Sequence, residues 1–357
     1  MGQSCAYLNN IDYNYYALKN EETNYKASNY HKESSSILDN SLKYYKPNMK
    51  KIIKLQAYFR GYITRRQSTL TFSLVKKKSS YTSSWSKISP PFCLSNLAVQ
   101  TAEKKVGEFV FDVSINEKHL IEKPPFKNEA GTIYIGQWNR KNQKHGKGIM
   151  YWPDGSKYEG YWEDDRACGK GRIIYSDGDI YQGQWKNDKA EGFGEYISVD
   201  GSHYDGFWKN DQPHGGGKEI SPDGSKYDGN FFFGKKQGKG TFLWKDGSSY
   251  VGEFNNNEIE GFGKYIWADG RIYEGTWKNS MMDGKGSFFW PDGRKYIGEY
   301  KEDKKHGKGE FYWNDKSKYC GNWANGKQEG VGLYTSPEGI TQEGEWENGK
   351  KIKWLEP

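Results

Sequence analysis

The chain has 357 residues, of which 34% are apolar and 17% aromatic, with 44 glycines and a formal net charge of +7. No apolar run approaches the ~20 residues of a membrane span, and no secretory segment is present, so we expect a protein that is neither secreted nor membrane-spanning. The four cysteines, at positions 5, 93, 168 and 320, show neither disulfide nor metal spacing, which indicates a reducing, cytoplasmic setting.

The positive charge is confined to the N-terminal part of the chain. Residues 1–130 hold 20 Lys and Arg against 11 Asp and Glu, whereas the remainder holds 33 against 35. Between Asp39 and Glu103 there are twelve basic residues and no acidic one. Such a segment is attracted to anionic membrane lipid by about 1 kcal/mol per charge near the surface. Nucleic acid is not expected as a partner, because no recognition fold accompanies the charge.

The first residues, Met1-Gly2-Gln3-Ser4-Cys5-Ala6, resemble an N-myristoylation start, with Gly2 as acceptor and Cys5 placed for palmitoylation. Ala6 departs from the pattern, and an ordinary start of small residues is the alternative. One myristoyl chain anchors weakly, so a second acyl chain or a basic patch is needed, and this segment offers both. Residues 1–46 have no helical or strand period, and we predict that they are disordered.

Residues 47–68 are predicted to form a basic amphipathic helix. Ile52, Leu55, Phe59, Tyr62 and Ile63 recur at spacings of three and four, which places them on one apolar stripe. The stretch from Leu55 to Arg65 resembles the IQ motif. The resemblance implies binding of calmodulin or another EF-hand protein through Leu55, Gln56, Phe59, Arg60, Gly61, Tyr62, Ile63 and Arg65. Two alternatives stay open: the stripe packs on the rest of the protein, or the helix lies on a membrane, in which case EF-hand binding would act as a calcium switch.

Residues 69–126 are predicted to form a linker, since they contain a lysine run, many serines and Pro90-Pro91. Within them Gly107–Val113 alternates weakly between apolar and polar residues. We predict a strand there that caps the first hairpin of the following region, because the open edge of a sheet needs a cover.

From Tyr134 to the C-terminus one pattern recurs: its copies follow one another at 23 residues from Tyr158 on, and the first copy, at Tyr134, is one residue longer. Each copy reads Tyr-x-Gly-x-aromatic, a polar loop, Gly-x-Gly, an aromatic or aliphatic run, and usually Asp-Gly. Because alternate residues of a strand share a face, Tyr181, Gly183 and Trp185 point one way and the residues between them the other. The unit is therefore a β-hairpin with an aromatic and a polar face. The glycines are predicted to make room for rings from the neighbouring hairpin, and Asp-Gly to supply positive φ for the turn into the next copy.

These copies resemble the MORN repeat, with nine matches and a partial tenth. The resemblance implies an all-β repeat array at 127–357, an elongated single-layer antiparallel sheet of stacked hairpins, preceded by the disordered N-terminus and the IQ helix. The predicted repeat core comprises Tyr158, Trp162, Tyr181, Trp185, Tyr204, Trp208, Tyr227, Tyr250, Tyr273, Trp277, Tyr296, Tyr319 and Trp323.

No catalytic arrangement is recognisable, and we expect neither enzyme activity, nor a cofactor, nor a metal site. His145, His214 and His306 occupy equivalent loop positions whole repeats apart, which is too dispersed for one metal ion.

The sequence thus favours a scaffold that binds a protein on its array and an EF-hand protein on its IQ helix, tethered at the inner face of a membrane or to the cytoskeleton. One alternative is a structural subunit of a cilium or axoneme, because the repeats resemble those of radial-spoke-type proteins. Another is a regulatory or targeting subunit of a phosphoinositide kinase.

Overall fold

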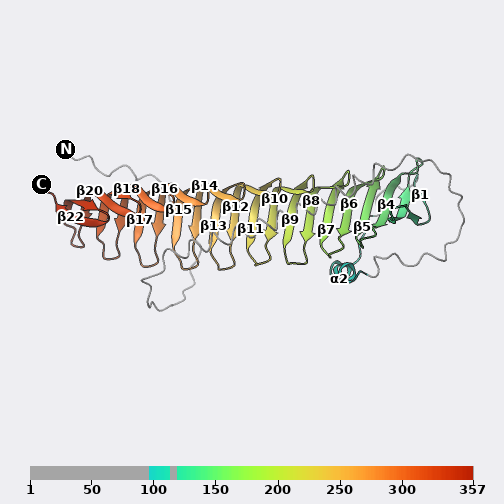
Figure 1. Cartoon of the computed structure of the whole chain (residues 1–357), viewed down its shortest axis with the longest axis horizontal. Coiled ribbons are helices and arrows are strands. Elements are labelled where there is room, and N and C mark those ends of the chain that lie inside the picture. Colours follow the sequence, from blue (N-terminus) through green and yellow to red (C-terminus); the bar gives the residue numbers. More distant parts are fainter. Residues whose placement is uncertain (1–95, 113–118, 357) are drawn as a thin grey trace. The chain divides into compact units, whose positions relative to one another are not determined.

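The computed structural model of the chain describes residues 96–112 and 119–356. These residues form one open antiparallel sheet of 22 strands and one helix, α2 (Leu97–Val106). The strands stand side by side along the sheet in chain order (Figure 1). The predicted all-β array of stacked hairpins is therefore confirmed.

The strands of the array are short, and in most hairpins the second is slightly longer than the first. Their bounds are β1 Ile121–Glu122, β2 Phe126–Lys127, β3 Ile133–Trp138, β4 Lys144–Tyr151, β5 Lys157–Glu163, β6 Arg166–Ile174, β7 Ile180–Lys186, β8 Lys189–Ile197, β9 His203–Lys209, β10 Gln212–Ile220, β11 Lys226–Phe232, β12 Lys235–Leu243, β13 Ser249–Asn255, β14 Glu258–Ile266, β15 Ile272–Lys278, β16 Met281–Phe289, β17 Lys295–Lys301, β18 Lys304–Tyr312, β19 Lys318–Ala324, β20 Lys327–Thr335, β21 Thr341–Glu347 and β22 Lys350–Trp354.

The two ends of the array are covered differently. At the N-terminal end, β1 and β2 both pair with β3 and so occupy its open edge. The predicted capping strand at 107–113 is wrong: residues 107–112 form no strand, and the cover comes from residues further along the chain. Phe126 in β2 anchors this cover, because its ring packs edge-on against Trp138 with centroids 5.7 Å apart. At the C-terminal end β22 pairs with β21 and closes the array.

Two kinds of turn join the strands. Within a hairpin, a two-residue turn has positive φ at both positions, as at Asn187 (52°) and Asp188 (67°), the geometry that matches the twist of paired strands. Between hairpins, the glycine of Asp-Gly has positive φ, for example 94° at Gly178, as predicted. The preceding Asp177 accepts a hydrogen bond from the backbone N–H of Asp179 at 3.2 Å, which holds the loop in shape.

The repeat glycines form an unbroken row of cross-strand pairs, from Gly136 with Gly148 to Gly332 with Gly344. A methyl group added at Gly183 would lie 2.7 Å from Oη of Tyr181, and one added at Gly194 would lie 2.4 Å from it. The tyrosine ring therefore lies across the two glycines of its own hairpin. The prediction that the glycines make room for a ring of the neighbouring hairpin is wrong, because the tyrosine and both glycines belong to the two strands of the same hairpin.

Rings also join each hairpin to the next. Tyr158 meets Trp162 of its own hairpin and Trp185 of the next edge-to-face, with centroids 5.1 and 5.2 Å apart. The indole N–H of Trp185 donates to the carbonyl oxygen of Gly171 in the preceding hairpin at 3.0 Å. Such ring pairs add about 0.5–1.5 kcal/mol to the free energy of burial. The residues named above as the repeat core are all buried, with exposed fractions from 0% to 8%.

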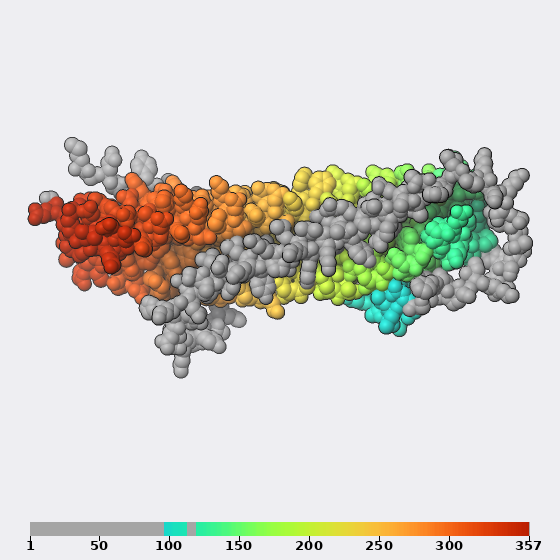
Figure 2. Space-filling model, in the orientation of Figure 1, coloured from blue at the N-terminus to red at the C-terminus, as the bar shows by residue number. Residues whose placement is uncertain are grey.

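The segment predicted as a linker contains the helix α2. Asn96 caps it: the side-chain oxygen accepts from the N–H of Ala98 at 3.0 Å, and the side-chain amide donates to the carbonyl oxygen of Ser176 at 3.0 Å. Glu103 forms an ion pair with Lys157 at 2.6 Å. Figure 2 shows α2 as a separate mass along one long border of the array. The helix is thus attached to the sheet at its start and at its middle.

Candidate binding surfaces of the array

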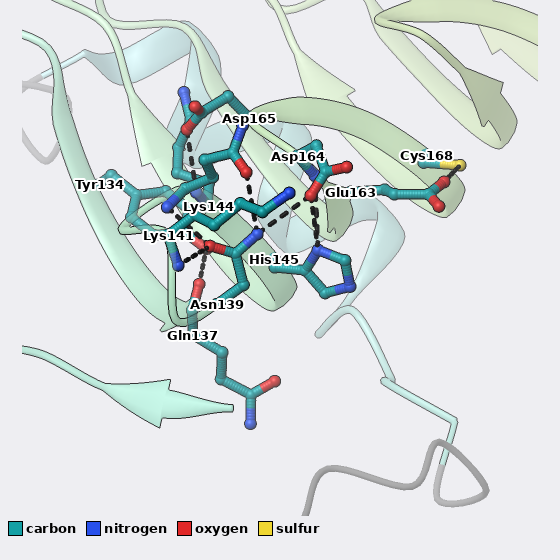
Figure 3. Close-up of polar contacts among 11 residues, drawn as sticks. Tyr134, Gln137, Asn139, Lys141, Lys144, His145, Glu163, Asp164, Asp165 and Cys168 are labelled. Atoms are coloured by element: carbon teal, nitrogen blue, oxygen red, sulfur yellow. Dashed lines mark hydrogen bonds and ion pairs between the residues drawn. The ribbon is translucent and has the colours of Figure 1, made fainter. Parts of the chain in front are cut away.

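Turn residues of one hairpin hold a strand of the preceding hairpin in place. At the first such junction, Asp165 accepts a hydrogen bond from the backbone N–H of Lys144 at 2.9 Å (Figure 3). Asp164 accepts from the side-chain amide of Asn139 at 3.0 Å and lies 3.4 Å from Nδ1 of His145. His145 therefore belongs to a turn network.

The same link recurs along the array. Asp211 accepts from the N–H of Ala190 at 2.7 Å, and burial raises the pKa of this carboxyl group to about 6. At Pro213 no N–H is present, and the turn residue that faces it is Gly234, which has no side chain to accept one. The second bond of the junction is kept: Gly234 donates its N–H to the carbonyl oxygen of Pro213 at 2.8 Å, as Asp211 does to Ala190 at 3.1 Å. At this junction, donor and side-chain acceptor are absent together.

A line of tryptophans marks the aromatic face in the C-terminal half of the array. Trp244, Trp267, Trp290 and Trp313 follow one another at the repeat period, and all four are half-buried. Ring contacts continue along the line; Trp244, for example, lies 4.9 Å from Tyr265 between centroids. This tryptophan line offers indole surface to apolar side chains of a partner.

Cations accompany the tryptophan line. The guanidinium groups of Arg271 and Arg294 lie 5.3 and 5.5 Å from the ring centroids of Trp267 and Trp290. The Lys305 ammonium lies 4.4 Å from the ring centroid of Phe311, and no carboxylate among the described residues lies within ion-pair distance of it. Burial and, to a lesser extent, Arg294 lower the pKa of Lys305 to about 8. An acidic group of a partner would be favoured here.

The opposite face of the sheet, termed here the outer face, carries α2. Ile174, Ile180 and Ile197 are successive pairing partners across β6, β7 and β8, and Val99 and Ala102 of the helix pack on them. These three isoleucines are called the α2 seat.

The outer face is less polar than predicted. Phe193 and Phe207 are cross-strand partners with rings 5.6 Å apart, and they remain 50% and 52% exposed. They differ from the buried rings in direction, because they occupy the alternate positions of their strands. Both faces of the array therefore present apolar surface.

Several predicted site residues lie outside the described part of the chain. These are the lipidation residues Gly2 and Cys5 and the whole IQ stretch from Leu55 to Arg65.

Within residues 96–112 and 119–356, no group of three or more His, Cys, Asp or Glu side chains could hold a metal ion. The helix in the same part of the chain is too short and too polar to cross a membrane.

Comparison with protein families identifies two motifs. The MORN repeat matches at nine places, 134–157, 158–180, 181–203, 204–226, 227–249, 250–270, 273–293, 296–318 and 319–341. The IQ calmodulin-binding motif matches residues 49–68. Both are non-catalytic binding motifs. A search of curated proteins found no match.

Solved structures similar to the chain include two TCP domains. The TCP10 domain of Danio rerio CPAP, in complex with a peptide of STIL, is 13% identical with a TM-score of 0.36, covering 67% of this chain and 99% of that one. The TCP domain of Drosophila melanogaster SAS-4, in complex with a proline-rich motif of Ana2, is 15% identical with a TM-score of 0.28, covering 55% and 98%. A streptogramin B lyase is 14% identical with a TM-score of 0.14, covering 66% and 86%.

The nine matches extend over more than half of the chain, and each coincides with strands of the described sheet. The glycine row and the Tyr–Trp contacts explain physically why the pattern repeats. The chain belongs to the MORN-repeat family, with an IQ calmodulin-binding motif ahead of the array.

Proposed function

We propose that this chain is a non-enzymatic scaffold that holds calmodulin or another EF-hand protein on its IQ motif and a second protein on its MORN array. The observation that carries the proposal is the IQ match at 49–68, which lies within a stretch that has no acidic residue. A basic helix with one apolar stripe suits the acidic, apolar groove of an EF-hand protein. The tryptophan line and the exposed rings of the outer face support a protein partner for the array.

The EF-hand part is tested by titrating calmodulin into the full chain, with and without calcium, by isothermal titration calorimetry. We expect one site, at which the double variant Gln56→Ala/Arg60→Ala binds at least about tenfold more weakly, since it removes both polar contacts and one charge-assisted bond. The matched control is Lys76→Ala/Lys77→Ala, which removes more charge outside the motif and should bind as the wild type does. Equal loss in both variants would reduce the IQ site to non-specific charge attraction.

We further propose that acylation at Gly2 and Cys5, together with the basic segment, tethers the scaffold to the inner face of a membrane. The test is extraction of cells that express the tagged wild type or the Gly2→Ala variant. Release of the wild type only by mild detergent, with Gly2→Ala soluble without it, is the expected result. Retention of both in the cytoskeletal pellet would favour a structural subunit of a ciliary or other cytoskeletal assembly instead.

A further inference from the structure

The α2 seat has a near-copy farther along the outer face. Ile266, Ile272 and Phe289 each follow a member of the α2 seat by 92 residues, which is four repeats. They are also joined by the same pairing: Ile266 is the partner of Ile272 across β14 and β15, and Ile272 is the partner of Phe289 across β15 and β16. We call these three residues the second seat.

The two seats differ in cover. Under α2, Ile174 and Ile180 are only 1% and 2% exposed, whereas Ile266 in the second seat is 37% exposed. Ile272 and Phe289 are half-buried, as is Ile197 in the α2 seat. The adjoining loop is also similar. The helix start lies against Gly178, where an added methyl group would be 3.5 Å from Cβ of Ala98, and the loop at the second seat presents Gly270 with a comparable positive φ.

Further apolar side chains widen the second seat. Leu243, Val251 and Phe262 lie on the same face of β12–β14 and are 43%, 56% and 53% exposed. Lys264, between them and the seat, stands opposite Glu274 in the pairing, but within the described part of the chain it forms no ion pair. Exposed apolar side chains on both sides of a lysine that has no ion pair are typical of an interaction surface.

We propose that the second seat binds an amphipathic α-helix of a partner protein in the way that α2 occupies its own seat. The strands here are paired on both sides, so a partner reaches the face of the sheet and not a free edge. The face of α2 that packs on the sheet carries Val99, Ala102 and Val106, at spacings of three and four. The partner helix would carry small or branched aliphatic residues at the same spacing and a carboxylate for Lys264. This inference rests on the proposed scaffold function, since it names the class of protein that the array holds.

The test uses the full chain with labelled isoleucine δ1 methyl groups, observed by NMR during titration with a capped peptide of residues 96–107, the helix α2 itself. We expect saturable shifts of the Ile266 and Ile272 signals, with those of Ile174 and Ile180 unchanged because they are already covered. The variant Ile272→Lys should weaken binding at least tenfold. It should fold, because lysine stands at the same repeat position in other copies, as Lys226 and Lys295.

The matched control is Ile135→Lys, which changes an isoleucine on the outer face of β3 that is 37% exposed, as Ile266 is, and should leave binding unaltered. No shift at Ile266 and Ile272 up to about 1 mM peptide, a concentration at which even weak docking is visible, would overturn the proposal. Shifts at Ile174 and Ile180 would overturn it too, since the peptide would then be exchanging with α2. Self-association of the chain that is lost in Ile272→Lys would assign the surface to a second copy. Calmodulin titration involves none of these residues, so failure of the IQ site is distinguished from failure of the second seat.

Discussion

At the scale of the residue, the array depends on glycines and tyrosines that fit together within one hairpin. The hydroxyl of this tyrosine has a partner as well: Tyr181 donates to the carbonyl oxygen of Gln184 at 2.9 Å, so burial of the ring does not leave its hydroxyl unsatisfied. The two glycines of Gly-x-Gly do different things. The first, such as Gly192 with φ of 82°, takes a backbone conformation that other residues avoid, and the second, Gly194, lies beneath the ring.

The adjacent glycines 216 and 217 test the role of the second glycine, because Gly217 is that glycine and Gly216 is the residue between the two. A methyl group at Gly217 would lie 2.4 Å from Oη of Tyr204, whereas one at Gly216 would meet nothing within 4 Å. We expect Gly217→Ala to lower the free energy of unfolding by about 1–3 kcal/mol or more, the usual cost of overpacking, and Gly216→Ala to be neutral or slightly stabilising. Urea unfolding of the full chain measures both. Equal effects would mean that the ring is not held against the glycine.

The carboxyl group of Asp211 gives a dependence of stability on pH. Its pKa is raised to about 6 by burial, so the folded state binds more protons than the unfolded state between about pH 4 and 6, and stability falls as pH rises through that window. Asparagine does the same structural work at the equivalent turn, where Asn257 accepts from the N–H of Lys236 at 2.8 Å. Asp211→Asn should therefore stabilise the protein at pH 7 by about 1–3 kcal/mol, at about 1.4 kcal/mol per pKa unit.

The same variant should lose its advantage near pH 4, where the aspartate is protonated in the folded state. Urea midpoints of wild type and variant at pH 4, 5, 6 and 7 provide the comparison. A difference that does not change with pH would contradict the account of the buried charge.

At the scale of the element, the hairpins could be predicted because their pattern returns at one period, so alternation and turn residues are read many times over. Which ring fills the space over the glycines could not be predicted, because tyrosines of the same and of the neighbouring hairpin fit the pattern equally. The helix α2 was missed because it is short, half of its residues are polar and its apolar face is narrow. The sequence features that indicate this helix are Asn96, which precedes its first turn as a cap, and Gly107, which follows its last turn.

The binding surfaces also differ in whether they could be predicted from the sequence. The IQ stretch is a local motif and was predicted from the sequence, and the family comparison matches it. The α2 seat was not predicted, because it depends on a contact between residues far apart in the chain. The exposed apolar side chains of the outer face were not predicted, because single apolar residues at alternate strand positions are scattered among polar ones.

The attachment of α2 is tested by Val99→Asp. Val99 is 2% exposed on the α2 seat, and burial of such a side chain contributes about 1.5–3 kcal/mol, so a charge there should release the helix. We expect residues 97–106 to lose protection from hydrogen exchange while the array keeps its thermal unfolding midpoint. Leu97→Asp is the control on the same helix, because Leu97 is 74% exposed, and it should keep the protection. Unfolding of the whole array in Val99→Asp would show that α2 is part of the core and not a helix docked upon it.

At the scale of the whole molecule, the chain separates two kinds of surface. In the array each hairpin contacts its neighbours, so the stability of the array is close to a sum of repeats and their interfaces. Its charges nearly balance, whereas the IQ stretch belongs to the basic segment that precedes it. An EF-hand protein and a partner of the array are therefore expected to bind different parts of the chain. The EF-hand protein would bind the basic IQ stretch with the help of charge attraction, and the partner of the array would bind through apolar contacts.

The most direct test of that claim is the isoleucine methyl spectrum of the full chain before and after calmodulin is added. The account predicts shifts at Ile52 and Ile63, in the IQ stretch, and none at Ile266 and Ile272, which should still respond to the α2 peptide in the presence of calmodulin. Unchanged signals at Ile52 and Ile63 would contradict the EF-hand role of the IQ stretch. Shifts at Ile266 and Ile272 on adding calmodulin would instead show that the two partners compete for one surface, and the chain would not join them.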